Sequence, residues 1–337
     1  MIAAIDLATV WAFIIAFAVF VYVVMDGFDL GLGILFPLFP GKADRDLIMN
    51  SVAPVWDGNE TWLVLGGGGL MAAFPLAYAV LMPALYTPVI AMLIGLIFRG
   101  VAFEFRWRTT QEKRNRWDIA FAGGSLLAAL AQGIALGAIL QGVHVEGRHY
   151  AGGWWDWLTP FSIMTGLALA VGYALLGATW LVMKTEGALR EKASSLSWSL
   201  LFAMLVAIGA VSVVTPFLHV AYAQRWFAWP NIIFTAPVPI AVAAVSVLLL
   251  RSLANRSEYQ PFLLSLLLFA LSYLGLGISM YPYIVPRSIT IWQAASPQSS
   301  QLFMLVGVAV LIPLILGYTG WAYWVFRGKV RPGSGYH

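Results

Sequence analysis

Two pairs of acidic residues interrupt stretches of this sequence that are otherwise apolar. Asp26 and Asp29 lie in VVMDGFDLGLG, and Asp57 and Glu60 lie in VWDGNETW. Both pairs have the spacing i, i+3, which places the two carboxyl groups on one face of a helix. Carboxyl groups at this spacing inside apolar helices can hold and pass protons, provided that their surroundings disfavour full ionisation.

A third apolar stretch carries a cation, Arg99 in LIFRG, followed by Glu104. One ionisable side chain at the centre of a membrane costs about 2.5–3.5 kcal/mol on insertion scales, so such residues pair or function. A single guanidinium cannot neutralise all the neighbouring acids, and carboxylates crowded together in a low dielectric cannot all ionise. The sequence therefore predicts carboxyl groups that hold protons. The structural alternative is a buried ion pair that only fixes the helix register.

The composition indicates that these charged residues lie in a membrane protein. The chain has 337 residues, of which 61% are hydrophobic and 10% charged, and its mean hydropathy is +0.84. Repeated apolar runs of about 20 residues are typical of a polytopic α-helical membrane protein, whereas the alternating segments of a β-barrel are missing. The absence of cysteine excludes disulfides and thiolate metal sites. The modest net charge of +4 favours no nucleic-acid partner.

The apolar runs predict an all-α integral membrane protein that forms a single transmembrane domain over residues 1–337. The first residues, MIAAIDLATVWAF, lack a basic region, so we expect the first helix to stay in the mature protein. Nine transmembrane helices are expected at residues 8–36, 52–74, 79–104, 118–141, 160–183, 196–221, 231–252, 260–282 and 301–326.

The loop charges predict the orientation of the chain. If the N-terminus is outside, the inner segments 41–46, 106–116, 184–192, 251–256 and 327–331 hold 15 Lys and Arg residues, and the outer segments hold 3. Basic residues accumulate on the cytoplasmic side, so the N-terminus is expected outside and the C-terminus inside. The acids of the first two helices, with Arg99 and Glu104 of the third, should then share one depth near the inner surface.

Other candidate sites are few. The LGGGG run at 65–69 favours close helix packing over a broken helix, because no proline interrupts it. His144 and His149 are expected in an outer loop, His219 near the outer end of the sixth helix, and His337 at the tail. A haem in a helix bundle needs an inward imidazole, so the chain is a poor candidate to ligate haem or another metal.

Several motifs resemble, in order and over essentially the whole chain, subunit II of the cytochrome bd-type quinol oxidases. They are MDGFDLGLG (25–33), VWDGNETWLV (55–64), ALYTPVIAMLIGLIFRGVAFEFR (84–106), GYALLGATWLVMKTEG (172–187), YPYIVPRSITIWQAAS (281–296) and VFRGKV (325–330). The short outer loops resemble the cyanide-insensitive branch of that family. The resemblance implies nine helices arranged as two four-helix bundles plus one peripheral helix, in the bacterial cytoplasmic (inner) membrane.

The resemblance also implies a function within the respiratory chain. The chain would pair with a haem-bearing subunit I, and sometimes with a very small third subunit, in a complex that oxidises quinol and reduces oxygen to water. Haem b and haem d would be ligated by subunit I and none by this chain, while a quinone could be bound here.

The resemblance assigns roles to individual residues. The proton path from the cytoplasm would use Asp26, Asp29 and Asp57, with Arg99 as charge partner. Glu60 shares the helix face of Asp57 and belongs to the same predicted path. Trp56 and Glu104 would lie beside this path.

Two alternatives to the oxidase subunit remain open from the residues alone. A proton-coupled secondary transporter could use the same carboxylates and the glycine run. An assembly scaffold could contain the same charges as inert buried pairs.

Overall fold

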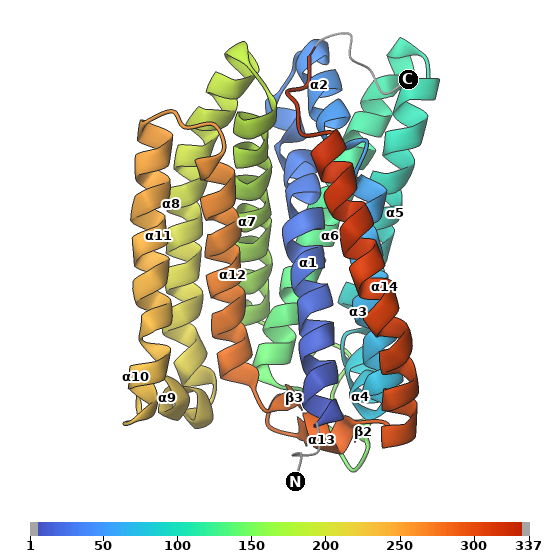
Figure 1. The fold of residues 1–337 in the computed structure, drawn as a ribbon, viewed down its shortest axis with the longest axis vertical. Coiled ribbons are helices and arrows are strands. Elements are labelled where there is room, and N and C mark those ends of the chain that lie inside the picture. The colour runs from blue at the N-terminus through green and yellow to red at the C-terminus, as the bar shows by residue number, and fades with distance from the viewer. Residues whose placement is uncertain (1–5, 332–337) are drawn as a thin grey trace.

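A computed structural model describes residues 6–331, and these residues form a long bundle of helices (Figure 1). The main helices are α1 (Leu7–Leu35), α3 (Trp56–Ala73), α5 (Tyr86–Arg108), α6 (Arg114–Gln141), α7 (Pro160–Lys184), α8 (Gly187–Leu218), α11 (Pro237–Ala254), α12 (Gln260–Met280) and α14 (Gln298–Val325). Shorter helices are α2 (Lys42–Val52), α4 (Pro75–Ala84), α9 (Val220–Phe227), α10 (Asn231–Thr235) and α13 (Ile291–Ala294), with 3-10 turns at Phe36–Leu38 and Gln111–Lys113.

Within residues 6–331, eight helical segments are long and apolar enough to cross a membrane. They are Leu7–Leu38, Tyr86–Arg108, Arg114–Gln141, Pro160–Lys184, Gly187–Leu218, Asn231–Ala254, Gln260–Met280 and Gln298–Val325. This confirms a multi-pass α-helical membrane protein. The predicted second span corresponds to α3, an 18-residue helix that carries Asp57 and Glu60 and is not among these eight segments. A ninth crossing through α3 therefore stays a prediction.

Proline residues divide two of the predicted helices. The expected helix at 79–104 is split into α4 and α5 at Leu85, because the ring of Pro88 clashes with the carbonyl of Ala84 in a continuous helix. The expected helix at 231–252 is split at Ala236, where Pro237 begins α11. Helix α8 begins at Gly187, nine residues before the predicted start, because a polar segment extends its N-terminal end.

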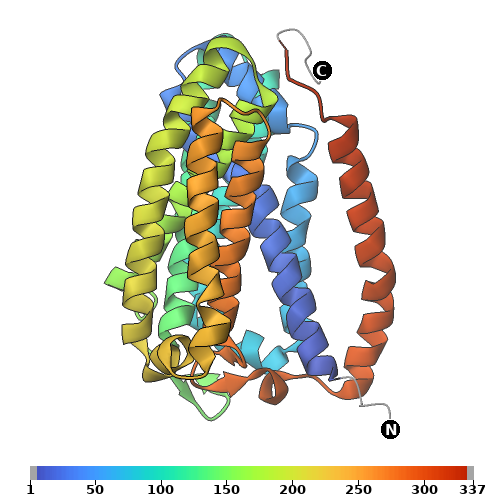
Figure 2. The same ribbon diagram turned by 60° about the vertical axis from the view of Figure 1, so that its left-hand side comes forward.

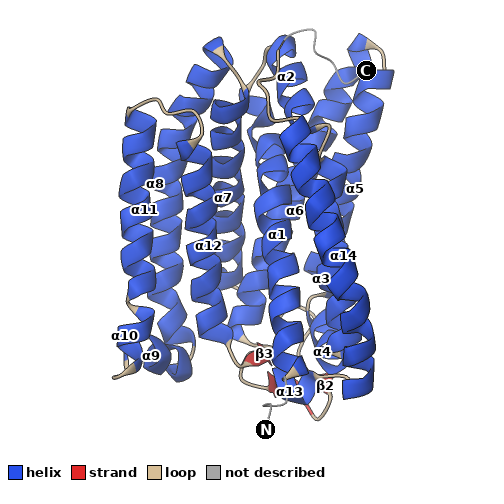
Figure 3. Ribbon diagram, in the orientation of Figure 1, coloured by secondary structure: helices blue, strands red, loops and turns tan. Residues whose placement is uncertain are grey.

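Two small antiparallel hairpins lie at the lower end of the bundle (Figure 3). One pairs β1 (Val145–Glu146) with β2 (His149–Tyr150), and the other pairs β3 (Tyr283–Val285) with β4 (Ile289–Thr290). These hairpins occupy the two longest connections of the sequence. The upper end instead carries α2 and the turns that follow α5, α7 and α11 (Figure 1).

Close approaches between helix backbones hold the centre of the molecule together. A Cβ atom on Gly31 of α1 would lie 1.8 Å from the carbonyl oxygen of Tyr173 of α7, so only glycine fits there. Gly95 of α5 and Gly124 of α6 face each other in the same way. A Cβ atom added to either glycine would lie 2.5–2.6 Å from the carbonyl oxygen of the other. In lipid, such contacts replace the hydrophobic effect as the source of helix association.

The glycine run at 65–69 lies within the continuous helix α3, so the helix is not broken there. Only part of the run provides close packing. Gly66 and Gly69 face Val19 and Ile15 of α1, whereas a Cβ on Gly67 or Gly68 would meet no atom of the described chain.

The last helix, α14, stands apart from the other helices along most of its length (Figure 2). Gln301 is its only buried residue among those described. The indole Nε1 of Trp11 donates to the Gln301 carbonyl at 3.1 Å near one end, and Lys184 Nζ donates to the carbonyls of Phe326 and Gly328 at the other. Contacts at its two ends therefore hold α14 against the bundle.

Candidate functional site

A buried ion cluster connects α1, α3 and α5. The guanidinium of Arg99 contacts the Asp26 carboxylate at 2.7 Å and the Glu60 carboxylate at 2.8 Å. The side chains of Arg99 and Asp26 are fully buried, whereas the side chain of Glu60 is 30% exposed. Glu60 therefore lies where the cluster meets the surface of this chain, and Arg99 and Asp26 lie inside.

Asp29 lies beside this cluster but contacts an amide in place of the guanidinium. Asn59 Nδ2 donates to Asp29 Oδ2 at 2.8 Å, while Asp29 Oδ1 is buried without a hydrogen-bond partner among the described residues. Tyr323 of α14 donates its hydroxyl proton to Asn59 Oδ1 at 2.9 Å. This hydrogen bond orients the amide so that Nδ2 donates to Asp29 and, at 3.4 Å, to the Met25 carbonyl, and it brings α14 into the site.

A second set of polar side chains extends from Asp26 between α1, α6 and α7. The Tyr173 hydroxyl donates to Gln132 Oε1 at 2.8 Å, and Gln132 Nε2 donates to the Tyr22 hydroxyl at 2.7 Å. Tyr22 lies one helical turn before Asp26, with its hydroxyl near that carboxylate. The hydrogen bonds of this series end at the Tyr22 hydroxyl, and neither oxygen of Asp26 has a hydrogen-bond partner among the described residues.

Aromatic rings cover the other side of the cation. The Trp56 ring stacks on Phe103 with centroids 4.9 Å apart, and the Arg99 guanidinium lies 5.7 Å from the Trp56 ring centroid. This geometry permits a cation–π interaction and excludes water from one face of Arg99. Trp56 thus lies beside the cluster.

The structure does not bring the other two sequence-predicted residues into the buried cluster. Asp57 lies in the first turn of α3 and is exposed. Glu104 is also exposed, with a side chain 58% accessible, and it contacts Arg108 at 3.3 Å on the outer face of α5. The rotation of each helix about its own axis directs these two side chains outward.

A separate ionic cluster lies nearer the upper end, where α2, α5 and α6 meet. Buried Arg106 contacts Asp118 at 2.6 Å and Asp46 at 2.6 Å, and Arg45 contacts Asp118 at 2.8 Å. Arg114 also lies 3.9 Å from Asp46, so each of the two carboxylates in this cluster has at least two cations beside it. We therefore interpret it as structural support for the helix ends.

Sequence reasoning missed five members of the site: Tyr22, Asn59, Gln132, Tyr173 and Tyr323. Asn59 lies inside the VWDGNETW motif, two residues after Asp57, so its position in a charged motif was the available signal. Gln132 is an amide within the apolar run of α6, which could also have indicated a buried polar site. Tyrosines are common in membrane helices, so their sequence context carries no comparable signal.

The described histidines do not fit a haem held inside the bundle. His144 and His149 are exposed at the β1–β2 hairpin, where His144 lies 3.3 Å from Glu146. His219 Nε2 lies 2.9 Å from the Gln141 carbonyl oxygen, and His337 is outside the described residues. Across residues 6–331, no group of three or more His, Asp or Glu side chains is arranged to hold a metal ion.

The fold and the site together define a polytopic α-helical membrane protein with a buried carboxylate–guanidinium cluster. The family model for cytochrome bd terminal oxidase subunit II matches residues 7–326. The chain therefore belongs to the cytochrome bd terminal oxidase subunit II family, and it is a component of a quinol-oxidising oxidoreductase complex of the respiratory membrane.

Individual relatives agree with this assignment. The chain is 32% identical to the cytochrome bd-I ubiquinol oxidase subunit 2 of Escherichia coli K12, over 95% of this chain and 94% of the relative. It is 25% identical to the cytochrome bd ubiquinol oxidase subunit 2 of Bacillus subtilis, over 96% of this chain and 97% of the relative. The fold matches a chain of the bd oxidase from Geobacillus thermodenitrificans with a TM-score of 0.74 and 18% identity, covering 95% of this chain and 99% of that one.

Family membership implies haems in the complex and a partner subunit I. It does not support the alternative of a proton-coupled secondary transporter.

Proposed function

We propose that this chain is the subunit that ligates no haem and that conducts protons from the cytoplasm toward the site of oxygen reduction. The partner's haems supply the redox chemistry, in which oxygen reduction to water consumes protons. The observation that carries the proposal is the composition of the buried cluster. The three carboxyl groups of Asp26, Asp29 and Glu60 lie around one guanidinium, Arg99, which contacts only Asp26 and Glu60.

The contacts of Arg99 divide the carboxylates into two kinds. Asp26 and Glu60 each contact the guanidinium, so their negative charge is stabilised directly. Asp29 is fully buried and receives one amide N–H, with no cation in contact in the described chain. A proton on Asp29 removes the cost of an uncompensated buried charge. We therefore assign Asp29 as the carboxyl group that carries the proton.

The other acids give the path a direction. Exposed Asp57 precedes Glu60 by one helical turn on α3, and partly exposed Glu60 contacts Arg99. In this proposal Asp57 collects protons at the surface and Glu60 passes them inward to Asp29 and Asp26. Glu104 lies beside this route only in sequence, since its side chain pairs with Arg108 outside the cluster.

The proposed orientation places the collecting end in the cytoplasm. We infer nine crossings, with the N-terminus outside and two four-helix bundles, α1/α3/α5/α6 and α7/α8/α11/α12, plus peripheral α14. The basic segments assigned to the inside belong to the upper end of the bundle, with α2 and the turns after α5, α7 and α11 (Figure 1). Arg148 and Arg287 belong to the hairpins at the opposite end. The proposed location is the bacterial cytoplasmic (inner) membrane.

The proposal also includes partners and cofactors. Haem b and haem d are held by subunit I, since the described imidazoles of this chain are exposed or bonded to a backbone carbonyl. A bound quinone in this subunit, a very small third subunit and membership of the cyanide-insensitive branch stay predictions. Haem spectra, solvent extraction of quinone and the masses of co-purifying chains test them.

The test is Asp29→Asn in the purified complex reconstituted into liposomes. We expect quinol oxidase activity coupled to proton uptake to fall at least tenfold, with an unchanged haem spectrum and unchanged subunit composition. Glu112→Gln, an exposed acid at the same predicted inner side, serves as the control and should keep the wild-type rate. A wild-type rate for Asp29→Asn in an intact complex would show that the cluster is an inert scaffold.

A further inference from the structure

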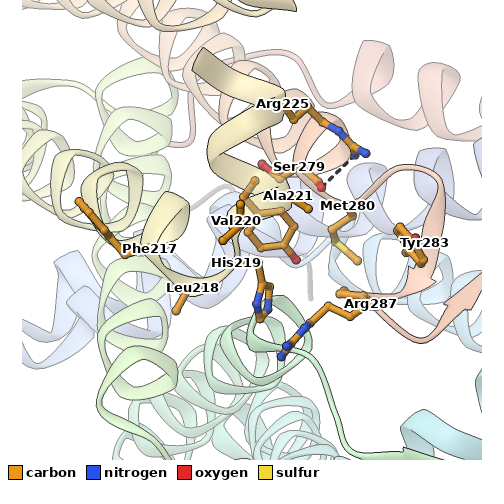
Figure 4. Close-up of a pocket in the computed structure, with 12 residues that line it drawn as sticks. Phe217, Leu218, His219, Val220, Ala221, Arg225, Ser279, Met280, Tyr283 and Arg287 are labelled. Carbon is orange, nitrogen blue, oxygen red and sulfur yellow. Dashed lines mark hydrogen bonds between the residues drawn. The ribbon is translucent and has the colours of Figure 1, made fainter. Parts of the chain in front are cut away.

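A cavity of about 500 Å³ lies at the lower end of the bundle, far along the chain from the ion cluster. It opens between the end of α8, helix α9, the end of α12 and the β3–β4 hairpin (Figure 4). His219, Tyr222, Arg225, Ser279 and Arg287 supply its polar wall. None of these residues takes part in the proposed proton path.

The charged residues that line this cavity are both cations. Arg225 is half-buried and donates to the backbone carbonyls of Ile278 and Ser279 at 3.0 and 3.1 Å, and to that of Tyr281. These bonds fix its position and leave its charge uncompensated, because no carboxylate lines the cavity. The cavity therefore has a positive potential.

Arg287 is the cation available to a ligand. Its guanidinium is directed toward His219 across the cavity (Figure 4), and no ion pair of Arg287 is seen within residues 6–331. The acid in the adjoining cavity, Asp156, already accepts hydrogen bonds from the Tyr150 hydroxyl at 3.1 Å and the Gly153 amide at 2.8 Å. Asp156 is thus engaged within its own loop.

The remaining wall is apolar and reaches the outside of the bundle. Phe217 is 85% exposed and Val220 is 72% exposed, and both line the cavity. They lie where the apolar spans of α8 and α12 end, which is the depth of the membrane–water interface. An occupant of this cavity therefore has an anionic group beside Arg287 and an apolar part that extends past Phe217 into the lipid.

We propose that this cavity binds the phosphodiester headgroup of an anionic membrane phospholipid, with its acyl chains along α8. Arginine is suited to this task because its planar guanidinium donates two hydrogen bonds to one phosphate. The two cations and the absence of a lining carboxylate favour lipids with a net negative charge over zwitterionic lipids.

The experiment compares Arg287→Ala with wild type, using the assembled oxidase complex. The delipidated complex is titrated with phosphatidylglycerol, phosphatidylcholine and inorganic phosphate, and bound molecules are counted by native mass spectrometry. Arg287→Ala should weaken one phosphatidylglycerol site about tenfold, the loss expected for one charge-assisted contact of about 1.4 kcal/mol. Phosphatidylcholine should bind this site more weakly, and inorganic phosphate should not displace the lipid.

Arg148→Ala is the matched control, because Arg148 is an exposed arginine at the same end but outside the cavity. It should retain the wild-type lipid count. If Arg287→Ala does not assemble, Val220→Trp tests the same site by filling its apolar opening while both arginines remain. Equal phosphatidylglycerol binding by wild type and the assembled variant would overturn the proposal. So would displacement by phosphate alone, or a quinone in place of the lipid.

Discussion

At the scale of single residues, the function of the buried cluster depends on how many groups share Arg99. The guanidinium makes direct contact with Asp26 and Glu60, and the Trp56 ring covers it. Burying a guanidinium is favourable only while its partners are charged and hydrogen-bonded. Arg99 therefore stabilises the anions beside it, while Asp29 is left to a neutral amide.

This dependence predicts strong coupling between Arg99 and Asp26. Arg99→Gln should destabilise the complex by about 3–5 kcal/mol, because it leaves buried Asp26 without its cation. Adding Asp26→Asn should recover part of this loss, since the double variant contains no unpaired carboxylate at that position. Thermal unfolding of the purified complexes, followed by the haem absorbance, measures both effects. Strictly additive losses would argue against a direct buried pair.

A second prediction at the residue scale concerns how His219 makes stability depend on pH. Burial and the nearby positive charge of Arg287 lower the pKa of His219 from its usual 6.5. Arg225 and Tyr222 of α9 also line its cavity, and burial raises the pKa of Tyr222 to about 12, so Tyr222 stays neutral. The unfolded chain therefore binds a proton more readily than the folded chain below about pH 6.5, and this contribution to stability falls as the pH falls.

Replacing His219 by Gln should make the apparent Tm less sensitive to acid between about pH 7.5 and 5.5. The effect is small because the side chain is partly exposed to solvent. Scanning fluorimetry of wild type and variant across this pH range compares the two slopes. A variant that is more sensitive to acid than wild type would contradict the stated pKa direction.

At the scale of elements, glycine contacts decide which helices touch. The α1–α7 contact at Gly31 places α1, with its two aspartates, against the helix that carries Tyr173. A larger side chain would separate these helices and move Tyr173 away from Gln132. The fit of α1 against α7 thus positions the polar series beside Asp26.

A matched pair of glycine substitutions tests this packing. Gly31→Ala should cost about 1–3 kcal/mol or prevent assembly, because its Cβ would overlap the Tyr173 carbonyl. Gly209→Ala on α8 should be neutral or stabilising by about 0.5–1 kcal/mol, because no atom lies within 4 Å of the added Cβ. The yield of assembled complex and its Tm report both outcomes. Equal behaviour of the two variants would contradict a tight α1–α7 contact.

At the scale of the whole molecule, the end of the bundle that carries the basic loops has to be the end at which the proposed proton path opens. The proposed proton path is useful for uptake only if the upper end of the bundle, with α2, faces the cytoplasm. The loop charges support this orientation independently of the cluster, because Asp26, Asp29, Asp57, Glu60 and Arg99 were not counted in either set of loops.

The cysteine-free sequence makes this orientation easy to measure. Single cysteines at Arg148 and Glu112 should react differently with a membrane-impermeant maleimide in intact cells. Labelling is expected at position 148, in the outer hairpin, and at position 112 only after the membrane is permeabilised. The reverse pattern would place the acids on the wrong side for proton uptake.

Local chemistry explains what could be predicted from the sequence alone. Long apolar runs establish a multi-pass helical protein, basic loops predict its orientation, and the i, i+3 spacing places acids together on a face. These features depend on neighbouring residues. Contacts between helices depend instead on the rotation of each helix about its axis, which the spacing within one helix does not specify.

Only the tertiary structure therefore decided which polar groups meet. It brought Tyr323 of α14 to Asn59 across 264 positions of sequence, and it directed Asp57 and Glu104 away from the cluster. It also placed Arg287 beside His219 at the opposite end of the molecule. The sequence determined the charges that had to be compensated in the membrane. The packing of rigid helices determined which group contacts each charge.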